Sequence, residues 1–243
     1  METILNADPM NWEQTLRDLP ERRNDAYKKS FDRIQARTGA FKVTVCHLLS
    51  WVFRAKRQVR LSEVEAALQH TNGGRIAREV MYLCEGLLFC DVDEDRIRWT
   101  EPAVAQFFEQ IIRDSTETSD FLGEAELALA CLKCIESLPS PERLSIPQLE
   151  RILEQEKFLK YACEYWASHW TVDGAKGQEL KEKILAVFKR SETRLFVHDV
   201  ARFADTGRIS TERPEKYPFL QFLARYGLKE CCQDLLDGKK LSM

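Results

Sequence analysis

The sequence predicts a mainly α-helical fold with one short β-hairpin. Only 10 glycines and 8 prolines occur among its 243 residues, fewer than the roughly 12% that these two turn-forming types usually make up. Through most of the chain, apolar residues recur at spacings of three and four, the period of a helix face. The period changes to strict alternation at residues 96–100. With 44% hydrophobic and 31% charged residues, the chain has the composition of a folded globular protein.

Residues 1–40 are expected to form two connecting helices. Asp8 followed by Pro9 is typical of a helix start, and this short helix is expected to end at Pro20. The second helix is expected to end at Gly39. Its buried face carries residues at helical spacing, namely Tyr27, Phe31 and Ile34.

Residues 41–113 are expected to form one compact domain that starts with three helices. The first helix has an apolar stripe made by Val45, Leu48, Leu49 and Val52. The second helix begins at Ser62 and Glu65, whose spacing of three residues is that of a capping box. The third helix follows the break at residues 72–74 and ends at Gly86, with an apolar face made by Ile76, Val80 and Leu83.

A β-hairpin follows these three helices. Residues 87–92 form a short apolar run, residues 93–95 have turn chemistry, and Ile97 and Trp99 alternate with polar residues. Three helices followed by a hairpin is the element order of a winged-helix domain. A further helix begins near Pro102, with a buried face made by Val104, Phe107, Phe108, Ile111 and Ile112.

Beyond the polar boundary at residues 114–120, residues 120–243 are expected to be helical throughout. One helix is expected around residues 127–138, one long helix across residues 149–170, and two more around residues 180–188 and 195–203. The last two helices flank Gly227 as an αα-hairpin. The sequence therefore predicts a right-handed stack of antiparallel helices after the winged-helix domain.

Two aromatic stretches carry a resemblance to a known family. Residues 48–68 contain Leu49, Trp51, Ala55, Arg57, Glu63 and Ala66. Residues 158–170 contain Phe158, Leu159, Tyr161, Ala162, Tyr165, Trp166 and His169. Both resemble the region that follows the NACHT module in fungal ankyrin-repeat signalling NTPases, which are relatives of the nucleotide-binding innate-immunity receptors. Residues 84–99 resemble the wing hairpin of that region, and residues 222–238 resemble a first ankyrin-like helix pair.

The resemblance implies a regulatory arm whose winged helix packs on an NTPase core and favours its inactive state. Two departures concern the nucleotide. Glu101 stands where the family has a histidine that in the wider receptor family contacts ADP, and Ala103 stands where it has serine or threonine. A carboxylate at that position would repel phosphate. None of the ten glycines lies in a P-loop pattern, so no cofactor is expected.

One basic strip lies at the end of the first helix of the expected winged-helix domain. It consists of Arg54, Lys56, Arg57 and Arg60. The strip is either a solvated face or a contact for an acidic surface of a protein partner. It is the candidate partner-contact site of this sequence.

Charge argues against nucleic acid as the partner. The net charge is −3, whereas proteins that bind polyanions carry a clear basic excess. The third helix offers Arg75 and Arg78 but also two glutamates. The hairpin carries four acidic residues, Asp91, Asp93, Glu94 and Asp95. A DNA-binding winged-helix protein remains the alternative hypothesis, because the third helix of a winged-helix domain can enter the major groove of DNA.

No metal-binding or catalytic residues are expected. Cys131 and Cys134 form a single C-x-x-C, whereas a structural zinc takes two such pairs or two added histidines. Cys46 lies beside His47, and neighbouring residues on a helix point about 100° apart.

The remaining histidines and aromatic residues have structural interpretations. Cys163 and His169 are six residues apart and share no helix face. The three histidines His70, His169 and His198 are expected at the surface or at helix ends. The stripe of Tyr165, Trp166 and Trp170 is expected in the core between stacked helices.

The expected function is that of a non-enzymatic scaffold in signalling. Its partner is expected to be a protein, either an NTPase domain in the same or another chain or another signalling protein, and not a membrane or nucleic acid. The eight cysteines lie mostly among apolar residues, which is typical of reduced thiols. Because neither a secretory signal nor a membrane-spanning run is evident, we expect a cytoplasmic protein, with the nucleus as the alternative.

Overall fold

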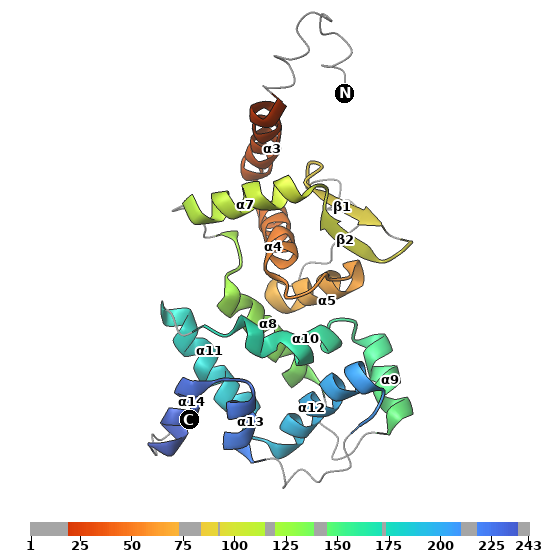
Figure 1. Cartoon of the computed structure of the whole chain (residues 1–243), viewed down its shortest axis with the longest axis vertical. Helices are drawn as coiled ribbons and strands as arrows, with labels where there is room; N and C mark the ends of the chain where they lie inside the picture. The colour runs from red at the N-terminus through yellow and green to blue at the C-terminus, as the bar shows by residue number, and fades with distance from the viewer. Residues whose placement is uncertain are drawn as a thin grey trace, which may run out of the picture.

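The computed structural model describes residues 19–72, 84–91, 93–114, 120–138, 145–171, 174–209 and 218–237. This described portion is mainly helical, with one two-stranded sheet (Figure 1). We refer to residues 19–114 as the N-terminal part and to residues 120–237 as the C-terminal part. Within the described ranges, no helix combines the length and the apolar character needed to cross a lipid bilayer.

The N-terminal part contains the predicted hairpin. Its elements are α3 (Leu19–Gln35), α4 (Ala40–Arg54), α5 (Leu61–Asn72), β1 (Leu88–Asp91), β2 (Arg96–Trp99) and α7 (Pro102–Asp114). Strands β1 and β2 pair antiparallel, with Cys90 opposite Ile97. Ile97 is buried and its neighbours Arg96 and Arg98 are exposed, so the predicted alternation is confirmed. The expected third helix, around Ile76, Val80 and Leu83, lies outside the described residues, and the winged-helix assignment stays a prediction.

Helix α3 includes Pro20, the residue at which the preceding short helix is expected to end. Helix α3 begins at Leu19, so Pro20 lies in its first turn. Proline fits there because a first-turn residue has no intrahelical partner for an N–H, which proline lacks. The helix predicted upstream, from Asp8 and Pro9, lies outside the described residues.

The expected capping box of Ser62 and Glu65 is wrong, because α5 begins at Leu61, two residues before the start that a Ser62 cap implies. Glu63 turns back to the helix start, where its Oε2 atom accepts a hydrogen bond from the Arg60 N–H at 2.8 Å. Ser62 instead donates its N–H and its hydroxyl to the two carboxylate oxygens of Asp95, at 2.8 and 2.6 Å. A carboxylate from the hairpin turn thus stabilises the start of α5. This bond joins the hairpin to α5.

The C-terminal part is helical where it is described. Its elements are α8 (Glu124–Ser137), α9 (Ile146–Gln155), α10 (Leu159–Tyr165), the 3₁₀ helix η3 (Trp166–His169), α11 (Gly174–Val187), α12 (Ser191–Thr206), α13 (Phe219–Arg225) and α14 (Lys229–Leu236). The predicted C-terminal helix pair is present as α13 and α14, and Gly227 between them has a φ of 71°. Glycine adopts this left-handed conformation without steric cost.

The single long helix expected across residues 149–170 is three separate elements. Helix α9 ends at Gln155, where the Glu156 N–H donates to the Ile152 carbonyl at 2.8 Å. The chain then turns, and α10 begins at Leu159. The turn places Phe158 in the core, with its ring centroid 5.2 Å from that of Trp51 on α4. Tertiary packing of this aromatic side chain accounts for the break.

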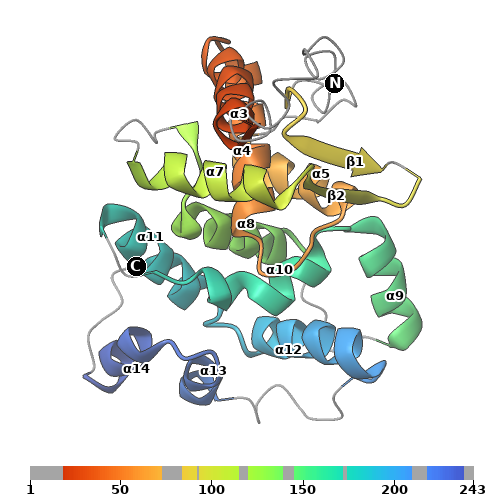
Figure 2. The same ribbon diagram turned by 45° about the horizontal axis from the view of Figure 1, so that its top comes forward.

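Buried apolar side chains from both parts form one continuous core. Helix α8 is central to it, because it contacts α5 of the N-terminal part as well as α10, α11 and η3 (Figure 2). Of the aromatic stripe expected in the core, Trp166 is fully buried, whereas Tyr165 and Trp170 are half-buried against it. The core therefore runs through the boundary expected near residues 114–120.

A second aromatic group, which we call the aromatic cluster, joins η3 and α11 to the C-terminal helix pair. It consists of Trp166, Phe188, Phe222 and Tyr226. The ring centroids of Trp166 and Phe188 are 4.6 Å apart, and those of Phe188 and Phe222 are 4.7 Å apart. Tyr226 closes the cluster at 4.9 Å from Phe222. Such pairs contribute beyond the area that they bury.

Candidate functional site

The basic strip predicted as a partner contact lies in the segment that joins α4 to α5, opposite α8 and α10. Two of its four residues face the start of α8. The Arg54 Nε atom donates to the Leu122 carbonyl at 2.9 Å, and the Lys56 Nζ atom lies 3.0 and 3.1 Å from the two carboxylate oxygens of Glu124. These side chains therefore join the N-terminal part to the C-terminal part.

Arg57, the third residue of the strip, is held by an acidic and aromatic pocket. Its Nη1 and Nη2 atoms bind the two oxygens of Glu63 at 2.8 and 2.7 Å, and its Nε atom is 3.8 Å from Glu164. The guanidinium also lies 5.2 Å from the ring centroid of Tyr161 and 5.7 Å from that of Tyr165. Hydrogen bonding to Glu63 raises the pKa of Arg57, so the guanidinium stays charged.

Arg60, the fourth residue, is exposed. It pairs with Arg96 of β2 through an isolated β-bridge and lines an open cleft of about 680 Å³ between the two parts, together with Lys157 and Lys160. The cleft also carries acidic residues, so its walls have mixed charge. The side chains of Arg54, Lys56 and Arg57 thus bind groups within the chain, and Lys56 and Arg60 are the two exposed members of the strip.

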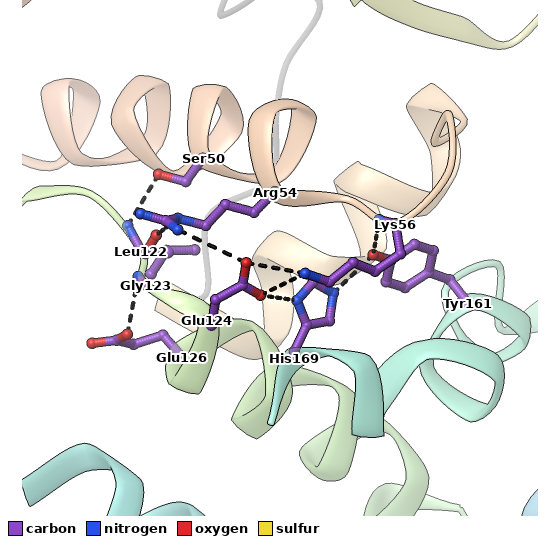
Figure 3. Close-up of polar contacts among 9 residues, drawn as sticks. All are labelled: Ser50, Arg54, Lys56, Leu122, Gly123, Glu124, Glu126, Tyr161 and His169. Carbon is purple, nitrogen blue, oxygen red and sulfur yellow. Dashed lines mark hydrogen bonds and ion pairs between the residues drawn. The ribbon is translucent and has the colours of Figure 1, made fainter. Parts of the chain in front are cut away.

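A hydrogen-bonded series of three residues continues from this strip into the C-terminal part (Figure 3). The His169 Nδ1 atom is 2.5 Å from the Glu124 Oε2 atom, and its Nε2 atom is 2.9 Å from the Tyr161 hydroxyl. The Tyr161 oxygen also accepts the backbone N–H of Lys56 at 3.1 Å. These contacts connect α8, α10 and η3 to the segment after α4.

His169 occupies one of its two expected positions, a helix end, but it is not at the surface. It lies at the end of η3, and its side chain is 0% exposed. His198 is also buried, whereas His70 is half-buried. One signal could have indicated this burial: His169 follows Tyr161 and Tyr165 at helical spacing, on an aromatic face. The polar atoms of a buried histidine need partners, and another segment must then supply them.

The protonation of this series follows from burial and from its partners. Burial lowers the pKa of His169, and nearby Lys56 and Arg54 act in the same direction, against the opposing effect of Glu124. Partial burial by itself would raise the pKa of Glu124, but hydrogen bonds from His169 and Lys56 bring it below its usual value. Burial raises the pKa of Tyr161. At neutral pH the series therefore consists of a carboxylate, a neutral imidazole and a phenol.

A carboxylate, an imidazole and a hydroxyl in series can activate a nucleophile in an enzyme. Here both Tyr161 and His169 are 0% exposed. Because a nucleophile must meet its substrate, a hydroxyl at this position is not placed for attack. The series instead stabilises the contact between the two parts, which we call the junction. The junction comprises Arg54, Lys56, Arg57, Glu63, Glu124, Tyr161, Glu164 and His169.

The two stretches that carry the family resemblance meet at the junction. Trp51 of the first stretch packs edge-on against Phe158 and Tyr161 of the second, with ring centroids 5.2 and 5.9 Å apart. Its ring is also 6.3 Å from that of His169. Arg57 of the first stretch also lies over the Tyr161 ring and is bound by Glu63. Residues that are about 100 positions apart in the sequence thus form one contact.

The cysteines are placed as core residues. Cys131 and Cys134 of the C-x-x-C are buried on α8, and Cys163 is buried on α10. Burial raises the pKa of Cys131 and of Cys163, which opposes formation of the thiolate that acts as nucleophile or metal ligand. Among the described residues, no group of three or more histidine, cysteine or acidic side chains could hold a metal ion.

Glu101, which stands where the resemblance places a nucleotide-contacting histidine, has a hydrogen-bond partner on α3. Its Oε2 atom accepts a hydrogen bond from the Tyr27 hydroxyl at 3.2 Å. This bond joins the start of α7 to α3.

No known protein family, curated protein or solved structure matches this chain.

Proposed function

We propose that this chain is a non-enzymatic regulatory arm, like the region between the NTPase and the ankyrin repeats of fungal NLR-like signalling proteins. The observation that carries the proposal is the meeting of the two resembling stretches at the junction. Trp51 and Arg57 contact Tyr161 from one side, and Phe158 and His169 complete the contact. The distinctive residues of both stretches thus hold two structural parts together.

This arrangement suits a module that presents surface to other proteins. The junction and the continuous core couple the N-terminal part to the helices of the C-terminal part. We therefore expect binding at one part to affect the other. Stacked helices offer extended surfaces for protein partners. By the family resemblance, the partner is an NTPase domain in the same chain or in another.

Two measurements test this proposal together: the sequence of the native transcript and the rate of ATP hydrolysis by the NTPase domain. Sequencing of the full native transcript determines whether a P-loop domain is encoded before Met1. ATP hydrolysis by that domain is then measured with and without residues 1–243, which are added as a separate protein if the P-loop domain belongs to another chain. We expect faster hydrolysis without the arm, because the arm favours the inactive state. Equal rates in both forms would contradict the proposal.

A DNA-binding function is the second candidate, and one observation favours it. Three of the four hairpin acids have partners within the chain: Asp91 accepts two turn N–H groups, Asp95 binds Ser62 of α5, and Glu94 pairs with Arg96 at 2.8 Å. The exposed face of β2 also carries Arg98. Retention of the chain on duplex DNA at low salt, lost at higher salt, would support this candidate. No retention at low salt would exclude it.

A further inference from the structure

One carboxylate at the junction serves three basic side chains. The Glu124 Oε1 atom lies 3.0 Å from the Lys56 Nζ atom and 3.9 Å from the Arg54 Nη1 atom. The Glu124 Oε2 atom lies 3.1 Å from Lys56 Nζ and 2.5 Å from His169 Nδ1. The carboxylate balances one of the two permanent positive charges beside it. A positive charge on His169 would therefore be the third in a group that contains one carboxylate.

The hydrogen-bond network assigns the hydrogen of His169. The Glu124 carboxylate can only accept, so the hydrogen of a neutral His169 lies on Nδ1 and Nε2 accepts the Tyr161 hydroxyl, whose oxygen also accepts the Lys56 N–H (Figure 3). The Nδ1 hydrogen is donated to Glu124. With a neutral His169, every donor and acceptor in this series has a partner.

A proton added to His169 breaks this match. A hydrogen on Nε2 would meet the hydrogen that Tyr161 directs to the same position, and the buried hydroxyl would lose its acceptor. The imidazolium would also be the third cation around Glu124, beside Lys56 and Arg54. The side chain of Lys56 is 30% exposed and that of Arg54 is 21% exposed, whereas His169 is 0% exposed. Lys56 is therefore the cation that moves into solvent at the lowest cost.

We propose that Glu124, His169 and Tyr161 form a proton-operated latch. Uptake of one proton from solvent by the His169 Nε2 atom displaces Lys56 from Glu124 and releases residues 55–58 from α10. The aromatic rings of Trp51 and Tyr161 flank the imidazole at 6.3 and 6.0 Å. The charged groups around it are Glu124 on α8, Lys56 in the released segment and Arg54 at the end of α4. The latch would make the contact between the segment after α4 and α10 depend on pH, whichever partner the chain binds.

The direction of the switch follows from burial. Burial lowers the pKa of His169, so the imidazole is neutral and the latch is closed at neutral pH. The latch opens on the acid side of the ordinary histidine range, where few other side chains change charge. Glu124 keeps its charge in this range because its own pKa lies below the usual carboxyl value.

Amide hydrogen exchange of the whole chain, followed residue by residue by NMR, tests the latch. The Lys56 N–H donates to Tyr161, so its protection reports the closed state. After correction for the intrinsic pH dependence of exchange, we expect its protection to fall about tenfold between about pH 7.5 and about pH 5.5. His169→Gln should remove this fall. His47→Gln is the matched control, because His47 is also buried but lies outside the latch, and this variant should keep the fall.

Two results would overturn the proposal. One is a Lys56 amide with equal protection at both pH values, and the other is an equal fall in His169→Gln. If His169→Gln does not fold, the ring nitrogens of His169 are followed in the unmodified chain. Their spectrum should change from the Nδ1–H tautomer to the imidazolium with the same midpoint as the Lys56 amide. Different midpoints would separate the two events and reject the latch.

Discussion

The junction and the aromatic cluster both hold helices together, but they do so by different physics. In the aromatic cluster, Trp166, Phe188 and Phe222 are fully buried and touch through their rings. At the junction, Lys56 and Arg57 keep about a third of their side chains in solvent and bind carboxylates at defined distances. One contact is apolar and closed, and the other is charged and half open.

Because of this difference, the aromatic cluster should mainly stabilise the fold, whereas the junction should respond to pH. Apolar burial is non-directional and does not depend on protonation, so the aromatic cluster should hold the C-terminal helix pair under all mild conditions. Charge-assisted hydrogen bonds depend on geometry and on the charge of each partner. The junction is therefore the contact that a change in pH can open. Substitutions in the two regions can confirm or refute this contrast.

The largest effect is expected in the aromatic cluster. Phe222→Ala removes a fully buried ring that contacts Trp166, Phe188 and Tyr226. We expect the free energy of unfolding, measured with chemical denaturant, to fall by about 4 kcal/mol, because a cavity remains where the ring was. Leu236→Ala on α14 is the control. Leu236 is 66% exposed, so its loss should cost less than about 0.5 kcal/mol. Similar losses in both variants would contradict the role of the cluster.

A smaller loss is expected at the junction. Arg57→Met leaves the Glu63 carboxylate, whose side chain is only 6% exposed, without its bidentate partner. Removing one member of a buried ion pair costs 3–5 kcal/mol, and the partial exposure of Arg57 reduces the expected loss to about 2 kcal/mol.

Arg60→Met provides the control for this substitution within the same basic strip. Arg60 is exposed, so we expect a change in the free energy of unfolding of less than about 0.5 kcal/mol. If Arg60→Met destabilised the chain as much as Arg57→Met, the loss could not be assigned to the ion pair of Arg57 with Glu63.

The pH dependence of stability should distinguish the two regions. A histidine with a lowered pKa binds fewer protons in the folded than in the unfolded chain, so stability falls as pH drops below about 6.5. Burial lowers the pKa of His169, His47 and His70 alike. His169→Gln should therefore weaken, but not remove, the loss of stability between about pH 7 and about pH 5, measured by denaturant titration at each pH.

Phe222→Ala should leave that pH dependence unchanged, although it lowers stability at every pH.

Below about pH 5, the protonation of Glu124 adds a further loss of stability in the same direction. Its folded pKa lies under the usual carboxyl value of 4.5, so the unfolded chain takes up this proton first as pH falls. A pH dependence that is altered by Phe222→Ala and not by His169→Gln would reverse the contrast between the regions.

The smallest effect is expected from nucleotides. The sequence has no P-loop pattern, and Glu101 bonds to Tyr27 at the position where the resemblance has a histidine. A ligand that binds only the folded state must raise the melting temperature. We therefore expect ADP and ATP, with magnesium, to leave the melting temperature unchanged in a thermal denaturation assay. A dose-dependent rise would show that the chain has a nucleotide site.

The elements were largely predictable from the sequence, but their limits were not. The hairpin was predictable because Ile97 and Trp99 alternate with arginines, and α7 because its apolar face repeats at helical spacing. The start of α5 was misplaced because the group that stabilises it, Asp95, comes from the hairpin turn. The break after α9 depends on Trp51, which lies on another helix. In both cases a distant residue outweighs the local pattern.

The sequence by itself determined the helical character of the chain, the position of the hairpin and the identity of many core residues. These follow from local periodicity and composition, which each segment carries independently of the others. Only the tertiary structure decided that the side chains of Arg54, Lys56 and Arg57 bind carbonyl and carboxylate groups within the chain and that His169 is buried between Glu124 and Tyr161. Ion pairs and hydrogen bonds form between segments that are distant in the chain, and no local pattern encodes which segments meet.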